Sequence, residues 1–237
     1  MRGWLGLGGG DEFGAACEAG DRALLAAMGG TIHIAVVPTA QADGGSNPVR
    51  AGGNGVRYFE RLGASAENVL ITDRASAADP QLVARLKEAN LIYIIGGNPG
   101  YLLGALRDTP AMQAVIDAWH GGVAVVGSSA GAMILCAAQR GGPSGAPEPW
   151  IAGIGLVPRV LAAVHHERAS DAHGMSLLQA LPPEYAVLGI DACNLAAWRP
   201  DGMWQMFGDG SVRVYTPGAA HPQRYAHNQT WSLSPAA

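Results

Sequence analysis

The sequence predicts an α/β fold: a mostly parallel central sheet flanked by helices on both faces, with short strands towards the C-terminus. Two observations carry this prediction. Up to about residue 139, apolar runs of strand length alternate with amphipathic stretches of helix length, an order typical of parallel strands joined by crossover helices. Beyond residue 152 the apolar runs become short and closely spaced, which indicates further strands.

Each element is expected from its local pattern. The first half should contain strands at 4–7, 31–37, 68–71, 91–95 and 123–127, and helices at 12–28, 54–64, 79–89, 111–120, from Asn98-Pro99 onwards and from Ser129 onwards. Asp79-Pro80 and Asn98-Pro99 each place a capping side chain before a proline, a standard helix start. Gly and Pro predict a loop at 139–152, and strands should follow at 155–164, 185–190, 194–198, 203–207 and 211–215. We expect one domain over 1–237, with 218–237 as a peripheral tail.

The composition narrows the functional class. Hydrophobic residues make up 49% of the chain and charged residues 14%, and the net charge is −4. These values are typical of a compact globular protein and exclude the basic footprint of a nucleic-acid binder. No apolar run approaches the ~18 residues that span a bilayer, and the N-terminus lacks a signal-peptide pattern. We therefore expect a cytoplasmic protein without membrane partners, and leave open whether it is a homo-oligomer.

Cofactor, metal and disulfide signals are weak. In "GLGGGDEF" Asp11 stands where a dinucleotide-binding G-x-G-x-x-G motif needs its last glycine. We expect no cofactor and no metal site, because no H-E-x-x-H or C-x-x-C pattern occurs. The three cysteines, Cys17, Cys136 and Cys193, are odd in number and far apart, which argues against a disulfide framework.

The most informative stretch is "VAVVGSSAGAMIL", residues 123–135. A G-x-S-x-G string is weak evidence in a chain with 34 glycines, but here it joins a predicted strand to a predicted helix. That context is typical of a nucleophile elbow, whose tight turn exposes the serine and requires small neighbours. Ser129 is the predicted nucleophile. The amide of Ala130, at the start of the new helix, is a predicted oxyanion donor.

A serine hydroxyl needs a base, a second oxyanion donor and an acid that orients the base. His165 follows a predicted strand and is the favoured base, with His166 the next choice. Gly97, after the strand at 91–95, is the expected second donor, because glycine lets the backbone approach a substrate closely. The acid is poorly determined: Glu148 is favoured, and Glu167 and Asp171 are alternatives.

The sequence also resembles a known family. The blocks "LGLGGGDEF", "IAVVPTA", "IIGGNPGYLL", "VVGSSAGAMIL", "GIGLVPRVLAAVHH", "LGIDACNLAAW" and "FGDGSVRVY" occur in the order found in the cyanophycinase and dipeptidase E family of serine peptidases. The resemblance spans residues ~4 to 215, and such co-occurrence is far more specific than one motif. It implies a class I glutamine-amidotransferase-like fold, a Ser129–His165 catalytic pair, and Gly97 and Ala130 in the oxyanion positions.

The implied activity is hydrolysis of amide bonds in small peptides, with acidic, Asp-containing peptides as one substrate class. Asn98 and Arg168 are expected to bind substrate, with Arg159 and Arg140 as further candidate cations for an acidic group. Cyanophycinases carry Asp-Gln before the histidine, where this chain has Ala163-Val164. Two alternatives stay open: a binding or regulatory member without activity, and an α/β-hydrolase-type esterase that uses His221 or His227.

Overall fold

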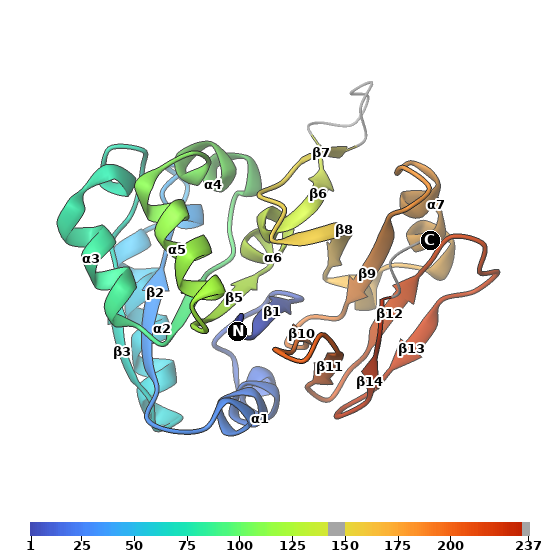
Figure 1. Cartoon of the computed structure of the whole chain (residues 1–237), viewed down its shortest axis with the longest axis horizontal. Helices are drawn as coiled ribbons and strands as arrows, with labels where there is room; N and C mark the ends of the chain where they lie inside the picture. The colour runs from blue at the N-terminus through green and yellow to red at the C-terminus, as the bar shows by residue number, and fades with distance from the viewer. Residues whose placement is uncertain (142–149, 234–237) are drawn as a thin grey trace.

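The computed structural model describes residues 1–141 and 150–233, and these residues form two sheets with helices packed around them (Figure 1). The eight-stranded sheet has the order β14-β11-β10-β1-β5-β4-β2-β3, and the six-stranded sheet β13-β12-β9-β8-β6-β7. The strands of the first sheet are β14 Thr230–Trp231, β11 Trp204–Phe207, β10 Leu195–Trp198, β1 Leu5–Gly8, β5 Ala124–Ser128, β4 Leu91–Ile94, β2 His33–Val37 and β3 Ser65–Asn68. Those of the second are β13 Gln223–Tyr225, β12 Val212–Tyr215, β9 Ala186–Ile190, β8 Val157–Val164, β6 Cys136–Arg140 and β7 Trp150–Ala152.

Parallel pairing is concentrated where the sequence predicted it. In the larger sheet β1, β5, β4, β2 and β3 are mutually parallel, while β10, β11 and β14 continue the sheet in antiparallel fashion. In the smaller sheet only β6, β8 and β9 pair in parallel. The predicted class, a mixed α/β fold with a central sheet and additional C-terminal strands, is confirmed.

Most helices begin where the sequence supplies a capping side chain. Their bounds are α1 Glu18–Met28, α2 Pro48–Arg61, α3 Pro80–Glu88, α4 Pro99–Leu106, α5 Pro110–His120, α6 Ala130–Leu135 and α7 Asp171–Gln179, with short 3-10 turns at Ala15–Cys17, Thr39–Gln41, Ser76–Ala78 and His166–Arg168. Helices α2 to α5 all start with proline, each preceded by a side chain that accepts an amide hydrogen bond. This is the arrangement expected from proline's fixed φ and missing N–H.

Three hydrophobic clusters hold the layers together. One lies between the larger sheet and α1 and α2, and includes Leu24, Tyr58 and Phe59. A larger one lies on the opposite face, under α3 to α6, and continues into residues of the smaller sheet such as Val160 and Leu188. A third joins the smaller sheet to α7. Helices therefore cover both faces of the central sheet (Figure 1).

Several local predictions were wrong. The strand expected at 68–71 lies at Ser65–Asn68, the helix expected from residue 12 begins only at Glu18, and α7 was not predicted. Parts of the predicted loop 139–152 belong to β6 and β7. The segment 218–233 contributes the short edge strands β13 and β14, one to each sheet. Within the described residues, no helix has the length and apolarity needed to cross a bilayer.

The cysteine prediction was also wrong for one pair. Cys17 and Cys193 form a disulfide with their Cα atoms 4.4 Å apart, although 176 residues separate them in sequence. Both sulfur atoms lie close to the carbonyl oxygen of Asp11, at 3.2 and 3.3 Å. The pair was not predicted because the two cysteines are far apart in the sequence. They meet because β1 ends beside the start of β10 in the larger sheet. Cys136 is buried and unpaired.

Candidate active site

The turn between β5 and α6 has the geometry of an elbow. Ser129 occupies it with φ 49° and ψ −112°, a combination that non-glycine residues rarely adopt and that commonly marks functional sites. A Cβ atom on Gly127 would overlap the backbone of Gly131, so the turn closes only with glycine there. Ser128 is buried whereas Ser129 is partly exposed. The hydroxyl of Ser129 therefore stands at the carboxyl edge of the parallel strands.

His165 supplies the imidazole that faces this serine. Its Nε2 lies 3.4 Å from Ser129 Oγ, a separation common for catalytic pairs without substrate. His165 follows β8 in a left-handed conformation, with φ 52°, and its amide donates to Gly9 O at 2.8 Å. The ring lies directly on Gly10, where any Cβ would overlap it. The end of β8 in the smaller sheet and the β5–α6 elbow of the larger sheet thus bring the imidazole and the hydroxyl together.

Asp11 is the carboxylate nearest to the other nitrogen of this ring. Its Oδ1 lies 3.7 Å from His165 Nδ1, within ion-pair range but beyond a hydrogen bond. Nδ1 is buried and has no hydrogen-bond partner among the described residues. Glu148, the favoured acid from the sequence, lies in 142–149, outside the described residues.

The two alternative acids are engaged elsewhere. Glu167 Oε2 accepts the amide of Ala192 at 2.8 Å, and its Oε1 pairs with Arg168. Asp171 is paired with Arg213 and Arg224, at 3.1 and 3.0 Å. Neither carboxylate lies within ion-pair distance of His165 in the described structure.

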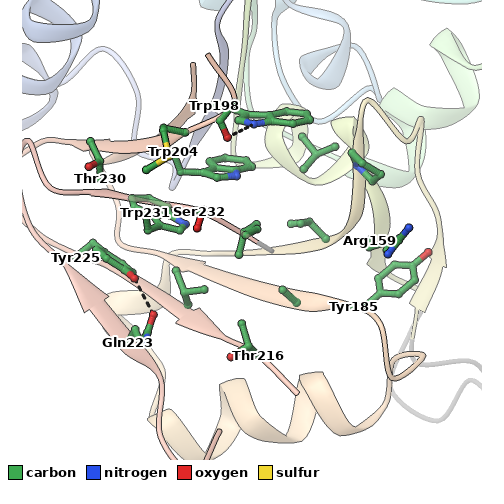
Figure 2. A pocket seen from close by; sticks show the side chains of 18 of the residues that line it. Arg159, Tyr185, Trp198, Trp204, Thr216, Gln223, Tyr225, Thr230, Trp231 and Ser232 are labelled. Atoms are coloured by element: carbon green, nitrogen blue, oxygen red, sulfur yellow. Dashed lines mark hydrogen bonds between the residues drawn. The ribbon is translucent and has the colours of Figure 1, made fainter. Parts of the chain in front are cut away.

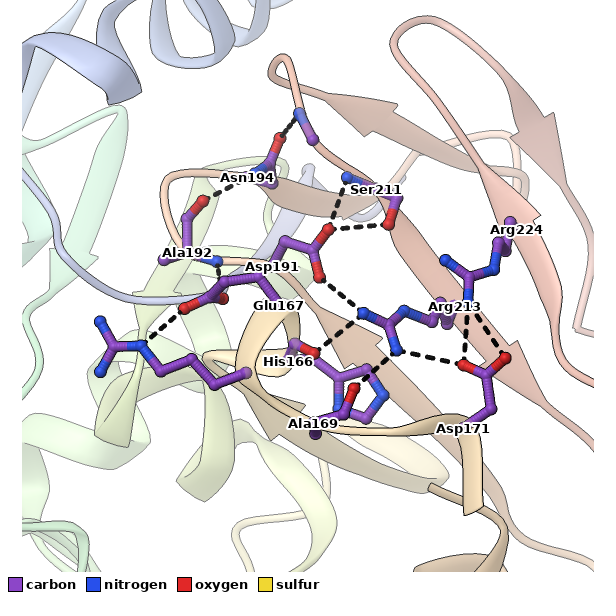
Figure 3. A network of polar contacts seen from close by, with 12 residues as sticks. His166, Glu167, Ala169, Asp171, Asp191, Ala192, Asn194, Ser211, Arg213 and Arg224 are labelled. Carbon is purple, nitrogen blue, oxygen red and sulfur yellow. Dashed lines mark hydrogen bonds and ion pairs between the residues drawn. The ribbon is translucent and has the colours of Figure 1, made fainter. Parts of the chain in front are cut away.

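His166 belongs to a buried polar network (Figure 3). The residue is 1% exposed, and its Nε2 lies 2.8 Å from Tyr215 Oη. Its ring packs on Gly189, where a Cβ would overlap it. Burial, and then the nearby Arg213 guanidinium, lower the pKa of His166 to about 4. His166 is therefore neutral near pH 7 and is packed in the interior, whereas His165 faces Ser129.

Arg213 is the centre of that network (Figure 3). Its two terminal nitrogens donate to the carbonyl oxygens of His166 and Ala169, at 2.9 and 3.0 Å. Its charge is balanced by Asp171 and by Asp191, whose Oδ1 lies 3.5 Å away. The guanidinium fork thus holds the turn that immediately follows His165.

The two amides predicted as oxyanion donors, those of Ala130 and Gly97, lie at the start of α6 and beyond the end of β4. Ala130 is the first residue of α6, so its N–H has no partner inside the helix. Gly97 follows β4, is exposed and has φ 145°. No hydrogen bond to the Gly97 amide is formed by any residue in 1–141 or 150–233.

The predicted substrate-binding side chains have structural partners. Asn98 caps α4 by accepting the Tyr101 amide at 3.0 Å, and its Nδ2 donates to Asp43. Arg168 is largely exposed and pairs with Asp11 and Glu167, at 3.5 and 3.0 Å. Cations therefore do not converge on Ser129 among the described residues.

A cavity of about 950 Å³ opens between the two sheets, but it lies at the other end of β8 (Figure 2). Aromatic side chains line much of it, including Trp198, Trp204 and Trp231, and Arg159 stands at its rim. The cavity reaches along β8 only as far as Val160, so about 16 Å of strand, at 3.3 Å per residue, separates it from His165. Ser129 and His165 do not line it. No group of three or more metal-ligating side chains occurs in the described part of the chain.

Comparison with known proteins gives a match that covers the residues of this candidate site. The model of Peptidase family S51 matches residues 7–193, which include the β1 loop, the elbow and His165. The chain belongs to peptidase family S51. The family resemblance of the sequence is therefore confirmed.

Relatives of this S51 peptidase include two cyanophycinases. That of Nostoc sp. (strain PCC 7120) is 28% identical over 193 residues, which cover 78% of this chain and 63% of the relative. That of Synechococcus elongatus is 32% identical over 203 residues, covering 82% and 62%. The chain thus spans less than two thirds of the length of these curated relatives. A solved peptidase from an acI-B1 Actinobacterium is 27% identical, with a TM-score of 0.83 and 98% of both chains covered.

Sequence reasoning did not predict that Asp11 lies beside His165, or that Glu12 contacts Gly96 and Ser128 next to the elbow. Asp11 and Glu12 lie in "GGGDEF", directly after β1, a segment assessed only for nucleotide binding. The available signal was positional: β1 pairs in parallel with β5, and Gly8 lies opposite Ser128. Residues that follow β1 therefore emerge at the same sheet edge as the elbow.

Proposed function

We propose that this S51 peptidase cleaves amide bonds of small peptides with Ser129 as nucleophile and His165 as general base. The observation that supports this most directly is the strained backbone of Ser129 together with the 3.4 Å approach of its Oγ to His165 Nε2. Strain at an exposed serine beside an imidazole is expected where a hydroxyl must be presented to substrate.

In the proposed reaction Ser129 Oγ attacks the substrate carbonyl carbon while His165 Nε2 takes the hydroxyl proton. The carbonyl oxygen becomes an oxyanion that accepts hydrogen bonds from the amides of Gly97 and Ala130. The C–N bond breaks, and the amine leaves with the proton from His165. Water, deprotonated by His165, then hydrolyses the acyl ester and frees Ser129.

We assign the orienting acid to Asp11, in place of Glu148. A carboxylate 3.7 Å from Nδ1 stabilises the imidazolium that forms in each step, and a shift of under 1 Å would complete a hydrogen bond. Asp11→Asn should therefore lower kcat more than KM, because the imidazolium exists only during the reaction.

We propose small peptides as the substrates, and acidic peptides as the narrower class to be tested. Arg168 is the cation nearest the site in the described structure, and two carboxylates already share it. A panel of fluorogenic dipeptides with N-terminal Asp, Ala or Lys tests this: an acidic preference requires the Asp compound to have the highest kcat/KM and Arg168→Ala to reduce that preference. Equal rates for all three would leave the peptidase proposal intact and remove the acidic one.

The central experiment is covalent labelling with a fluorophosphonate probe. We expect wild-type protein to label, Ser129→Ala to lose labelling completely, and His165→Ala to label at least about 100-fold more slowly. His173→Ala, an exposed histidine of α7, is the matched control and should label normally. Full labelling of Ser129→Ala would refute the assignment, and no labelling of folded wild-type protein would favour the inactive alternative.

The esterase alternative would need a C-terminal histidine. His227 Nδ1 accepts the amide of Gly208 at 3.2 Å, and His221 is exposed in the turn before β13. Comparison of His165→Ala with His221→Ala and His227→Ala separates the two readings, since only the variant of the true base should lose activity.

Three further expectations remain part of the proposal. A single domain is supported by the cluster that joins both sheets, and one cooperative unfolding transition would agree with it. Cell fractionation tests the proposed cytoplasmic location, and recovery of the protein outside the cytoplasmic fraction would contradict it. Sedimentation analysis tests for a homo-oligomer.

A further inference from the structure

Glu12 connects the two strand ends that carry the predicted nucleophile and the predicted oxyanion donor. Its Oε1 accepts the amide of Gly96 at 2.7 Å, and its Oε2 accepts the hydroxyl of Ser128 at 2.7 Å. Each partner is the residue immediately before a site residue: Gly96 before Gly97, and Ser128 before Ser129. Both contacts are short, as expected for hydrogen bonds to a carboxylate.

The carboxylate bridges a gap in the sheet. The ladder between β4 and β5 ends at the pair Ile94 and Gly127, so beyond it no backbone pairing holds the two strand ends to each other. On its other side Ser129 is tied to β1 by its amide, which donates to Gly8 O at 2.9 Å. Glu12 therefore supplies the link on the β4 side, where Gly97 lies.

A second side chain fixes the peptide unit that carries the Gly97 N–H. Gln41, in the turn after β2, donates from Nε2 to the carbonyl oxygen of Gly96 at 2.6 Å. The described residues contain no cis peptide bond, so the N–H of Gly97 points opposite to that carbonyl. Gln41 thereby directs the Gly97 amide away from itself, and Glu12 occupies the Gly96 amide, which leaves Gly97 as the free donor.

We propose that Glu12 and Gln41 are positioning residues for the oxyanion hole: they lock the two peptide units around Gly96 so that the Gly97 amide is aimed at the reacting oxygen beside Ser129. This inference rests on the proposed function. A negative charge so near an oxyanion would oppose the reaction. The contribution of Glu12 is therefore the position that it gives to Gly96 and Ser128, whose N–H and O–H groups stabilise its carboxylate by hydrogen bonding.

The inference separates geometry from charge. In Glu12→Gln the amide oxygen can still accept from Gly96 and the amide nitrogen can donate to Ser128 Oγ, so both contacts survive without the charge. In Glu12→Ala both are lost. Gln41→Ala loses only the contact to the Gly96 carbonyl. Gln113→Ala, which removes an exposed contact to Asp117 on α5, is the matched control.

The test measures phosphonylation by a fluorophosphonate probe, split into the maximal rate constant and the probe concentration at half-maximal rate. The probe's phosphoryl oxygen occupies the oxyanion position as Ser129 Oγ displaces fluoride. We expect Glu12→Ala and Gln41→Ala to lower the rate constant about 10- to 100-fold with the half-maximal concentration changed by less than about threefold. Glu12→Gln should stay within about threefold of wild type, and Gln113→Ala should match it.

Two results would overturn the inference. Equal loss in Glu12→Gln and Glu12→Ala would assign the role to charge, and unchanged rates in Glu12→Ala and Gln41→Ala would leave both contacts purely structural. If Glu12→Ala does not fold, Gln41→Ala and Glu12→Gln still decide, since each keeps the Ser128 contact. Loss of labelling in Ser129→Ala establishes the proposed function separately, so the inference can fail while that function stands.

Discussion

Replacing Gly10 by alanine should displace the imidazole of His165 while both Ser129 and His165 remain in the sequence. Gly10 has φ 109°, and a Cβ there would overlap the ring of His165. Carbon atoms in contact need about 3.5 Å, so the ring must retreat by roughly 1 Å or more. That would lengthen the 3.4 Å approach to Ser129 Oγ past hydrogen-bond range. A 1 Å misplacement of a catalytic group costs about 100-fold in rate.

The backbone strain of this substitution has its own control. Gly63 also has a positive φ, 93°, but a Cβ there would meet nothing within 4 Å. Both alanine variants should lose about 1–3 kcal/mol of folding free energy from the strained φ, visible as a lower Tm. Only Gly10→Ala should also lose fluorophosphonate reactivity per folded molecule, about 100-fold against Gly63→Ala. Equal reactivity of the two variants would refute the placement of His165 over Gly10.

The remaining predictions concern stability and are read from urea unfolding. Arg213→Ala leaves two carboxylates and two carbonyls without their buried donor and should cost about 3–5 kcal/mol, whereas Arg224→Ala, at an exposed pair, should cost no more than about 1. Folding lowers the pKa of His166 to about 4, so the unfolded chain binds a proton first as the pH falls. Between pH 6.5 and 4, the free energy of unfolding of wild type should therefore fall by up to about 3 kcal/mol relative to His166→Gln, reduced by any solvent screening. Burial raises the pKa of Asp21 to about 6, so its effect has the opposite sign: stability falls as pH rises from 3.8 through 6, and Asp21→Asn should remove that fall.

The sequence predicted most of the parallel half of the fold well, because most elements there have a strong local signal. The strands of β2 and β4 are continuous apolar runs, and α3 and α4 begin with a cap and a proline. The weaker predictions had weaker signals. β3, "SAEN", has no apolar pattern and is held by its pairing with β2, and α7 has little amphipathic character. Which strands join which sheet depends on contacts between distant segments, and no local pattern encodes them.

For the candidate site, the sequence predicted residues that have a local motif, and the structure brings the side chains of Ser129 and His165 together. Ser129 lies in an elbow and His165 at a strand end, and both predictions concern one residue and its immediate neighbours. The acid was different, because any carboxylate that the fold brings to the histidine would serve. Asp11 lies more than 150 residues before His165, and only the three-dimensional structure reveals their 3.7 Å separation. Choosing between His165 and His166 likewise needed the burial of the second ring.

The loop after β1 explains how a site built on two sheets stays assembled. Ser129 extends from β5 of the larger sheet, and His165 from β8 of the smaller one. Between them the carbonyls of Gly8 and Gly9 accept the amides of Ser129 and His165, both within 2.9 Å. In the same loop, Gly10 lies against the imidazole and Asp11 lies beside its Nδ1. Glu12 then accepts the amide of Gly96, after β4. A segment without a catalytic motif thus sets the distance between the two groups that have one, and this is why Gly10→Ala and Glu12→Ala in "GGGDEF" should lower the rate of reaction although neither residue belongs to a motif.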